Sequence, residues 1–157
     1  MEIDNDLAQE LLTMPKLITV GEEIKEKYEV RFPNVQISER YYMCSLDKKW
    51  RFLVDIKQKK FKRAAISLHF QEKDNAIPLF RVDYNATGHQ NPKVASEYVP
   101  NYLLPYVGLE IWAIPLEDYD FQPKKLSNVD ELCYAVEEFL KRINLQTDFT
   151  VERRLLL

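Results

Sequence analysis

The chain has 157 residues, of which 46% are hydrophobic and 30% charged, and its 22 basic and 25 acidic residues give a net charge of -3. This profile is typical of one soluble domain, so we expect a single domain over residues 1–157 and no global charge excess that would attract nucleic acid or a membrane. The mean hydropathy is -0.39, and the longest apolar runs are only a few residues, far short of the roughly 20 that crossing a bilayer requires. The acidic, polar start and two widely spaced cysteines predict a cytoplasmic protein without a signal peptide or a disulfide framework.

The N-terminal segment predicts a short helix over Asn5–Thr13. Leu7 and Leu11 recur near helical spacing, and Asn5 is a residue type that caps helices well. Pro15 ends this helix, because the residue before a proline is displaced from helical geometry.

Five segments alternate apolar and polar side chains, as strands with one buried face do. They are residues 28–32, 35–44, 50–56, 66–70 and 79–84. Pro33 and Asn34 predict a turn between the first two segments, and the run QKKFKR predicts a hairpin between the third and fourth. Residues 85–107 predict a long loop, and Gly108–Ile114 predicts a further strand.

The C-terminal part predicts an amphipathic helix after Ser127, because Val129, Val136, Phe139 and Ile143 fall on one helical face. The tail over residues 147–157 is interpreted as a final strand or a frayed end. The expected fold is therefore α+β: an antiparallel sheet of about five or six strands in a meander, packed against the C-terminal amphipathic helix, with a short N-terminal helix.

Two histidines are the candidates for acid–base chemistry. His69 is expected on the polar face of its strand, where an ordinary surface residue is the favoured interpretation. His89 lies beside Gly88 in a predicted loop, where a functional role and a simple turn role weigh equally. If the protein is an enzyme, we expect His89 to transfer a proton, Asp83 to orient it and Arg81 to hold phosphate.

Other chemistries are not indicated by the residues. With three scattered glycines the chain has no Gly-rich phosphate loop, and it contains no GxSxG, HExxH or CxxC motif. Asp83 and His89 alone are too few ligands for a metal site. We therefore expect neither a cofactor nor a metal.

Local charge is less balanced than the total. Between Asp47 and Arg63 there are eight basic residues against two acidic ones. The basic residues are Lys48, Lys49, Arg51, Lys57, Lys59, Lys60, Lys62 and Arg63. Clustered cations bind phosphates, and the nearby Tyr42, Trp50 and Phe61 are suited to stacking on unpaired bases, so this segment predicts RNA binding. The competing interpretation is a lysine-rich hairpin that aids solubility.

Short motifs of the chain resemble a family of small bacterial proteins of unknown function. They are KWRFLVDIKQKKFKRAAISLHF, PLFRVDYNATGHQNP, EYVP, IWAIPLEDYDF and VDELCYAVEEFLKRINL, spread over residues 49–145. More distantly, the strand and its HxNP loop are similar to small toxins of bacterial toxin–antitoxin pairs. In those toxins the loop carries further histidines after a proline, which VPNYLLPY lacks.

Two functions are expected from these features. The first is a small cytoplasmic protein of a bacterial or phage mobile-element or defence system that acts on RNA in toxin-like fashion. The alternative is a non-enzymatic protein-binding module, such as a phage-encoded inhibitor or an antitoxin-like partner, that uses an acidic or tyrosine-rich surface. The residues leave open whether the protein is an enzyme, and they do not indicate an oligomeric state.

Overall fold

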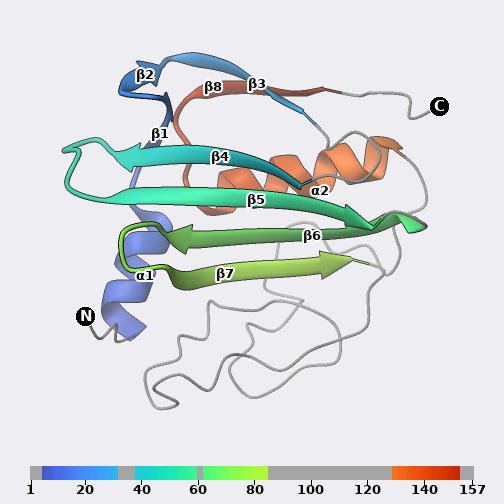
Figure 1. Cartoon of the computed structure of the whole chain (residues 1–157), viewed down its shortest axis with the longest axis horizontal. Coiled ribbons are helices and arrows are strands. Elements are labelled where there is room, and N and C mark those ends of the chain that lie inside the picture. Colours follow the sequence, from blue (N-terminus) through green and yellow to red (C-terminus); the bar gives the residue numbers. More distant parts are fainter. Residues whose placement is uncertain (1–4, 32–37, 60–61, 85–128, 153–157) are drawn as a thin grey trace.

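The computed structural model describes residues 5–31, 38–59, 62–84 and 129–152 (Figure 1). Its elements are α1 (Asn5–Thr13), β1 (Lys16–Val20), β2 (Glu23–Lys25), β3 (Lys27–Arg31), β4 (Ser38–Ser45), β5 (Arg51–Lys59), β6 (Lys62–Glu72), β7 (Ile77–Tyr84), α2 (Val129–Arg142) and β8 (Asp148–Glu152). Six strands form an antiparallel sheet in the order β2-β1-β4-β5-β6-β7. The other two, β3 and β8, pair in parallel.

The predicted antiparallel sheet with an N-terminal and a C-terminal helix is confirmed. The predicted N-terminal helix has the observed bounds of α1, and the tail contributes β8. The predicted strand Gly108–Ile114, the loop at residues 85–107 and the end of the tail lie outside the described residues. No helix in the described ranges has the length and apolar composition that crossing a membrane requires.

The sheet differs from the sequence expectation in that β1 and β2 were not predicted and β3 does not pair with β4. Strand β4 pairs with β1 and β5, whereas β3 pairs with β8 from the other end of the chain. In β3, Val30 is buried, and the Tyr28 ring meets the Tyr41 ring edge-on with centroids 5.9 Å apart. The edge of β4 is occupied by β1, so β3 pairs with β8 instead and packs these side chains into the core.

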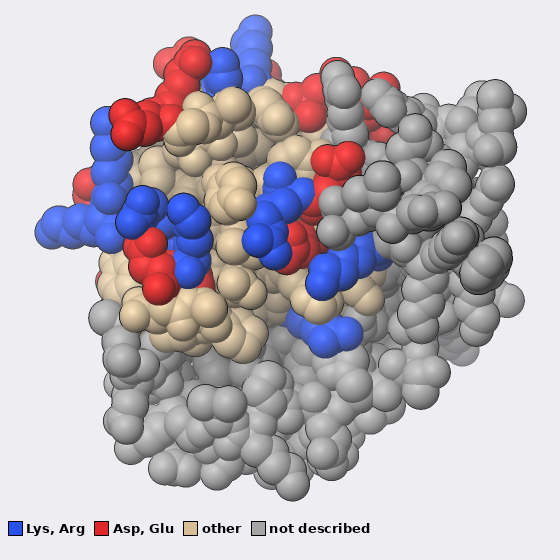
Figure 2. All heavy atoms as spheres, in the orientation of Figure 1, with Lys and Arg blue, Asp and Glu red and all other residues tan. Residues whose placement is uncertain are grey.

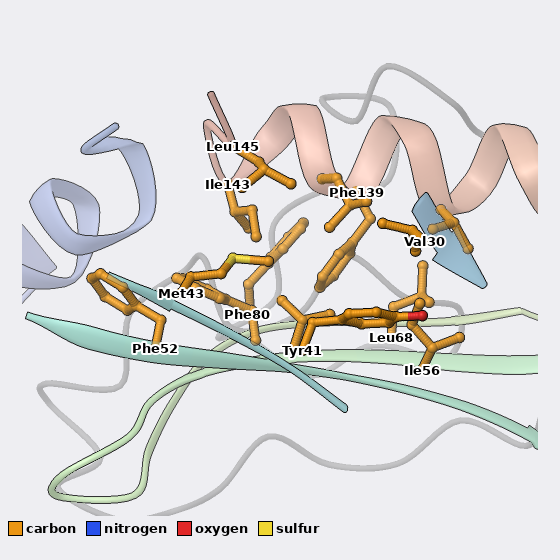
Figure 3. Packing of buried hydrophobic residues seen from close by; sticks show 14 of the residues in the cluster. Val30, Tyr41, Met43, Phe52, Ile56, Leu68, Phe80, Phe139, Ile143 and Leu145 are labelled. Atoms are coloured by element: carbon orange, nitrogen blue, oxygen red, sulfur yellow. The ribbon is translucent and has the colours of Figure 1, made fainter. Parts of the chain in front are cut away.

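The hydrophobic core lies between the sheet and α2 (Figure 3). Side chains from alternate strand positions point toward the helix, as the pleat of a strand requires. Phe80 of β7 stacks on Phe139 of α2, with ring centroids 5.0 Å apart and an interplanar angle of 14°. A second stacked pair, Phe52 and Phe70, joins β5 to β6. The contact between Phe80 and Phe139 fixes the helix on the sheet.

A buried lysine joins the C-terminal ends of both helices. Lys16 is fully buried at the start of β1. Its Nζ donates hydrogen bonds to the carbonyl oxygens of Leu12 (2.9 Å), Met14 (2.7 Å) and Ile143 (2.6 Å). It also lies 4.9 and 5.0 Å from the ring centroids of Phe52 and Phe70. Burial lowers the pKa of Lys16 to about 7.

The segment after α2 returns along β1. Asn144 adopts a left-handed conformation (φ 62°) that ends the helix, and the Leu145 amide donates to the Leu140 carbonyl. The amide of Ile18 then donates to the buried Thr147 hydroxyl, which in turn donates to the Lys25 carbonyl. These bonds hold the two ends of the described chain together.

Candidate nucleic-acid interface

An open cleft of about 370 Å³ lies on the face of the sheet that points away from α2. It is bordered by the β1–β2 turn, by β4 and by the turn after β6. Three basic side chains line it, Lys48, Arg51 and Lys73, together with the single carboxylate of Glu22. Its volume lies within the range of about 300–1,000 Å³ typical of small-molecule sites.

The β4–β5 turn presents Lys48 in a defined conformation. Lys48 has a left-handed backbone (φ 63°), and its amide donates to the Ser45 carbonyl. Asp47 Oδ1 accepts hydrogen bonds from the Ser45 hydroxyl (2.6 Å) and the Lys49 amide (3.0 Å). These bonds lower the pKa of the Asp47 carboxyl. The turn is therefore held by its own short-range hydrogen bonds.

The β6–β7 turn presents Lys73 in a similar way. The carboxylate of Glu72, 1% exposed, accepts the amides of Asp74 and Asn75, each at 2.9 Å. The Lys73 amide donates to the Arg51 carbonyl at 2.8 Å. Arg51 also forms an exposed ion pair with Asp74, with 2.9 Å between Nη2 and Oδ1. Both turns are thus ordered before any ligand arrives, which reduces the entropy lost on binding.

Replacing Glu72 with alanine is expected to lower the free energy of unfolding by about 1–2 kcal/mol, because two turn amides lose their acceptor. Urea denaturation measures this difference. Glu23→Ala, which removes an exposed carboxylate paired with Lys25, is the control and should change stability by no more than about 0.5 kcal/mol. Equal effects of the two substitutions would show that the buried carboxylate does not hold the turn.

The cleft also contains an aromatic ring and a thiol. Tyr42 of β4 is 41% exposed, and Lys73 Nζ lies 5.2 Å from its ring centroid. Cys44, two residues further along β4, is buried, and burial raises the pKa of its thiol. A raised thiol pKa disfavours the nucleophilic thiolate. The cleft is therefore equipped to bind a ligand through charge and stacking.

The eight predicted basic residues do not form one patch. Lys48, Lys49 and Arg51 lie at the start of β5, and Lys57 lies near its other end. Of the rest, Lys59 is in β5, Lys62 and Arg63 are in β6 without described side chains, and Lys60 is outside the described residues. A strand of nine residues spans roughly 30 Å, so the expected cluster is divided between two ends of the sheet. On the face in Figure 2, basic and acidic side chains lie side by side.

The structure places only part of the predicted catalytic group. Arg81 of β7 lies opposite His69 of β6, and Asp83 lies opposite Ser67. Asp83 has no described side chain, and His89 is outside the described residues. The proposed roles of Arg81, Asp83 and His89 therefore stay predictions. Within the described residues, no three His, Cys, Asp or Glu side chains come together in a way that would hold a metal ion.

His69 does lie on the polar face of the sheet, as its alternation predicts, between Asp55 of β5 and Arg81 of β7. Asp55 is 5% exposed and forms a bidentate pair with Arg40, at 2.7 and 2.9 Å. This contact raises the pKa of the Arg40 guanidinium.

Asp55 lies on the polar face of β5, the face opposite Phe52, Val54 and Ile56. The carboxylate is buried because β5 is a central strand and Arg40 satisfies its oxygens.

The chain was compared with models of known protein families. A model described as Family of unknown function (DUF6978) matches residues 3–145. The chain belongs to this family. No curated protein and no solved structure matches it. The resemblance to a family of unknown function is thereby confirmed, whereas the distant similarity to small toxins is not shown by these matches.

Sequence reasoning about this family member missed Lys73, although a signal was present. In a run of antiparallel hairpins, alternate turns lie at the same end of the sheet. The β4–β5 turn and the β6–β7 turn are alternate turns, so this topology requires Lys73 to lie near Lys48 and Arg51. Lys16, in contrast, carries no local signal, because nothing near it in the sequence indicates that its side chain is buried.

Proposed function

We propose that this protein binds RNA through the cleft formed by the β1–β2, β4–β5 and β6–β7 turns. The single observation that supports the proposal is the convergence of Lys48, Arg51 and Lys73 around an exposed tyrosine in one open cleft. Lysine and arginine supply the phosphate contacts that dominate affinity for nucleic acids, and an aromatic ring supplies a stacking platform. The acidic neighbours Glu22 and Asp74 reduce the local potential, so we expect moderate, salt-sensitive affinity.

The test is the affinity of the full chain for a fluorescently labelled RNA of about 10 nucleotides, measured by polarisation at several salt concentrations. A triple variant, Lys48→Gln, Arg51→Gln and Lys73→Gln, is expected to bind about 10- to 100-fold more weakly. Because each phosphate contact contributes about -0.7 to the slope of log K against log salt for single strands, that slope should become shallower by about 2.

Two lysines provide matched controls for this experiment. Lys141→Gln removes an exposed charge from α2, across the core from the cleft, and should leave RNA affinity unchanged. Lys57→Gln removes an exposed charge from the other end of β5 and should have little effect. A triple variant that binds like the parent would overturn the proposal. A loss with Lys57→Gln as large as with the triple variant would overturn the assignment to the cleft.

Toxin-like action on RNA in a mobile-element or defence system is the extension of this proposal. It requires a proton-transfer group, for which His89 with Asp83 and Arg81 is our candidate. The rival function is a protein-binding module. Purification with and without nuclease treatment separates the two, because bound RNA leaves at high salt whereas a stoichiometric protein partner survives nuclease.

A further inference from the structure

We infer, resting on the proposed RNA-binding function, that the cleft takes one unpaired nucleotide of a single strand, with its base stacked on Tyr42 and its phosphates on the surrounding cations. The inference concerns which form of RNA the protein selects. It depends on the exposure of the Tyr42 ring, on the cation that rests on that ring, and on the size of the cleft.

The Tyr42 ring is open to a planar ligand. The residue is 41% exposed on the face of the sheet opposite the core, and it lines the cleft. The other two aromatic residues expected to stack differ from it: Trp50 packs partly buried against the core, and Phe61 is outside the described residues. A base inside a duplex has both faces covered by its neighbours, so only an unpaired base can offer a face to this ring.

The position of Lys73 shows how the stacked base and the phosphate contact are linked. Its ammonium lies 5.2 Å from the Tyr42 ring centroid, where the negative face of the ring attracts it. An incoming base takes this position on the ring, and the flexible lysine stem carries the ammonium to the adjacent phosphate. Arg51 can likewise exchange its partner Asp74 for a phosphate. The side chains of this ion pair are 60% and 42% exposed, and ion pairs as exposed as this one contribute little to stability.

The size of the cleft also favours a single nucleotide as the ligand. About 370 Å³ is near the lower end of small-molecule sites and suits one nucleotide. Proteins that bind double-stranded RNA follow its shape across two successive minor grooves, about 16 base pairs in all. A cleft bordered by three turns of one small sheet has no such extent. The cleft therefore favours a single strand over a duplex.

The experiment compares a single-stranded RNA of about 10 nucleotides with the duplex of the same sequence, using the full chain and two variants of Tyr42. We expect the single strand to bind more tightly than the duplex. Tyr42→Phe should retain the affinity for the single strand, and Tyr42→Leu should reduce it about 5- to 100-fold, the range expected for one lost stacking contact. Duplex affinity should not respond to Tyr42→Leu.

Tyr134→Leu is the matched control, because Tyr134 is 49% exposed on α2 and lies outside the cleft. It should not change RNA affinity. A circular dichroism spectrum of Tyr42→Leu that matches the parent's shows that the variant is folded. Equal binding of duplex and single strand, or an unchanged affinity of Tyr42→Leu, would overturn this inference and leave the proposed RNA binding intact. Failure of the parent protein to bind either RNA would instead overturn the proposed function itself.

Discussion

Lys16→Met is expected to lower the free energy of unfolding by about 2–4 kcal/mol at pH 7. The substitution leaves the carbonyl oxygens of Leu12, Met14 and Ile143 without the ammonium that binds them. Each stranded carbonyl costs about 1–3 kcal/mol, and relief from burying a charge offsets part of that loss. Because these carbonyls lie in the last turn of α1 or directly after α1 and α2, the loss should appear in a single cooperative transition on urea denaturation.

The same residue predicts a pH dependence. The pKa of Lys16 is about 7 in the folded protein, and an unfolded lysine titrates near 10.4. Between these values the unfolded chain binds more protons, so the contribution of Lys16 to stability rises as the pH is raised from about 7 to about 10, by at most about 1.4 kcal/mol per pH unit. Below pH 7 both states are protonated, and the contribution no longer changes.

The pH effect is measured as the difference in the free energy of unfolding between the parent and Lys16→Met at each pH. The other titratable groups are the same in both proteins, so their contributions cancel. Lys25→Met is the control: Lys25 is partly exposed and paired with Glu23 on the surface, so its loss should cost no more than about 0.5 kcal/mol. A difference between parent and Lys16→Met that stays constant from pH 6 to about 10 would contradict a lysine pKa lowered by burial.

Phe139→Ala is expected to lower the free energy of unfolding by about 3–5 kcal/mol. Phe139 is 0% exposed and stacks on Phe80, so truncation removes buried surface and leaves a cavity between α2 and β7. Phe139→Leu, which keeps most of the volume, should cost clearly less. Urea denaturation measures both.

The ring stacking itself is isolated by combining Phe139→Leu with Phe80→Leu in a double-mutant cycle. The coupling should be about 0.5–1.5 kcal/mol, the range for an aromatic pair beyond its buried area. Tyr134→Ala, on the exposed side of the same helix, is the control and should be nearly neutral. A small loss for Phe139→Ala, similar to that of Tyr134→Ala, would show that α2 is not fixed on the sheet by this contact.

The sequence predicted several elements from local signals, although it missed β1 and β2. The alternation of Phe52, Val54 and Ile56 predicted β5, and Pro15 predicted the end of α1, because side-chain period and backbone restriction act within a few residues. It also identified Lys48 and Arg51 as candidates for phosphate contacts, and Tyr42 as a candidate for stacking. These predictions needed no knowledge of which strands are neighbours.

Only the tertiary structure decided which of these residues meet. The two turns that carry Lys48 and Lys73 are far apart in the sequence and come together because alternate hairpins share an end of the sheet. The same pairing separates Lys57 from Lys48, although the sequence suggested one basic cluster. The burial of Lys16 likewise depends on carbonyls from both ends of the chain, since the environment of a side chain is set by every element that packs around it.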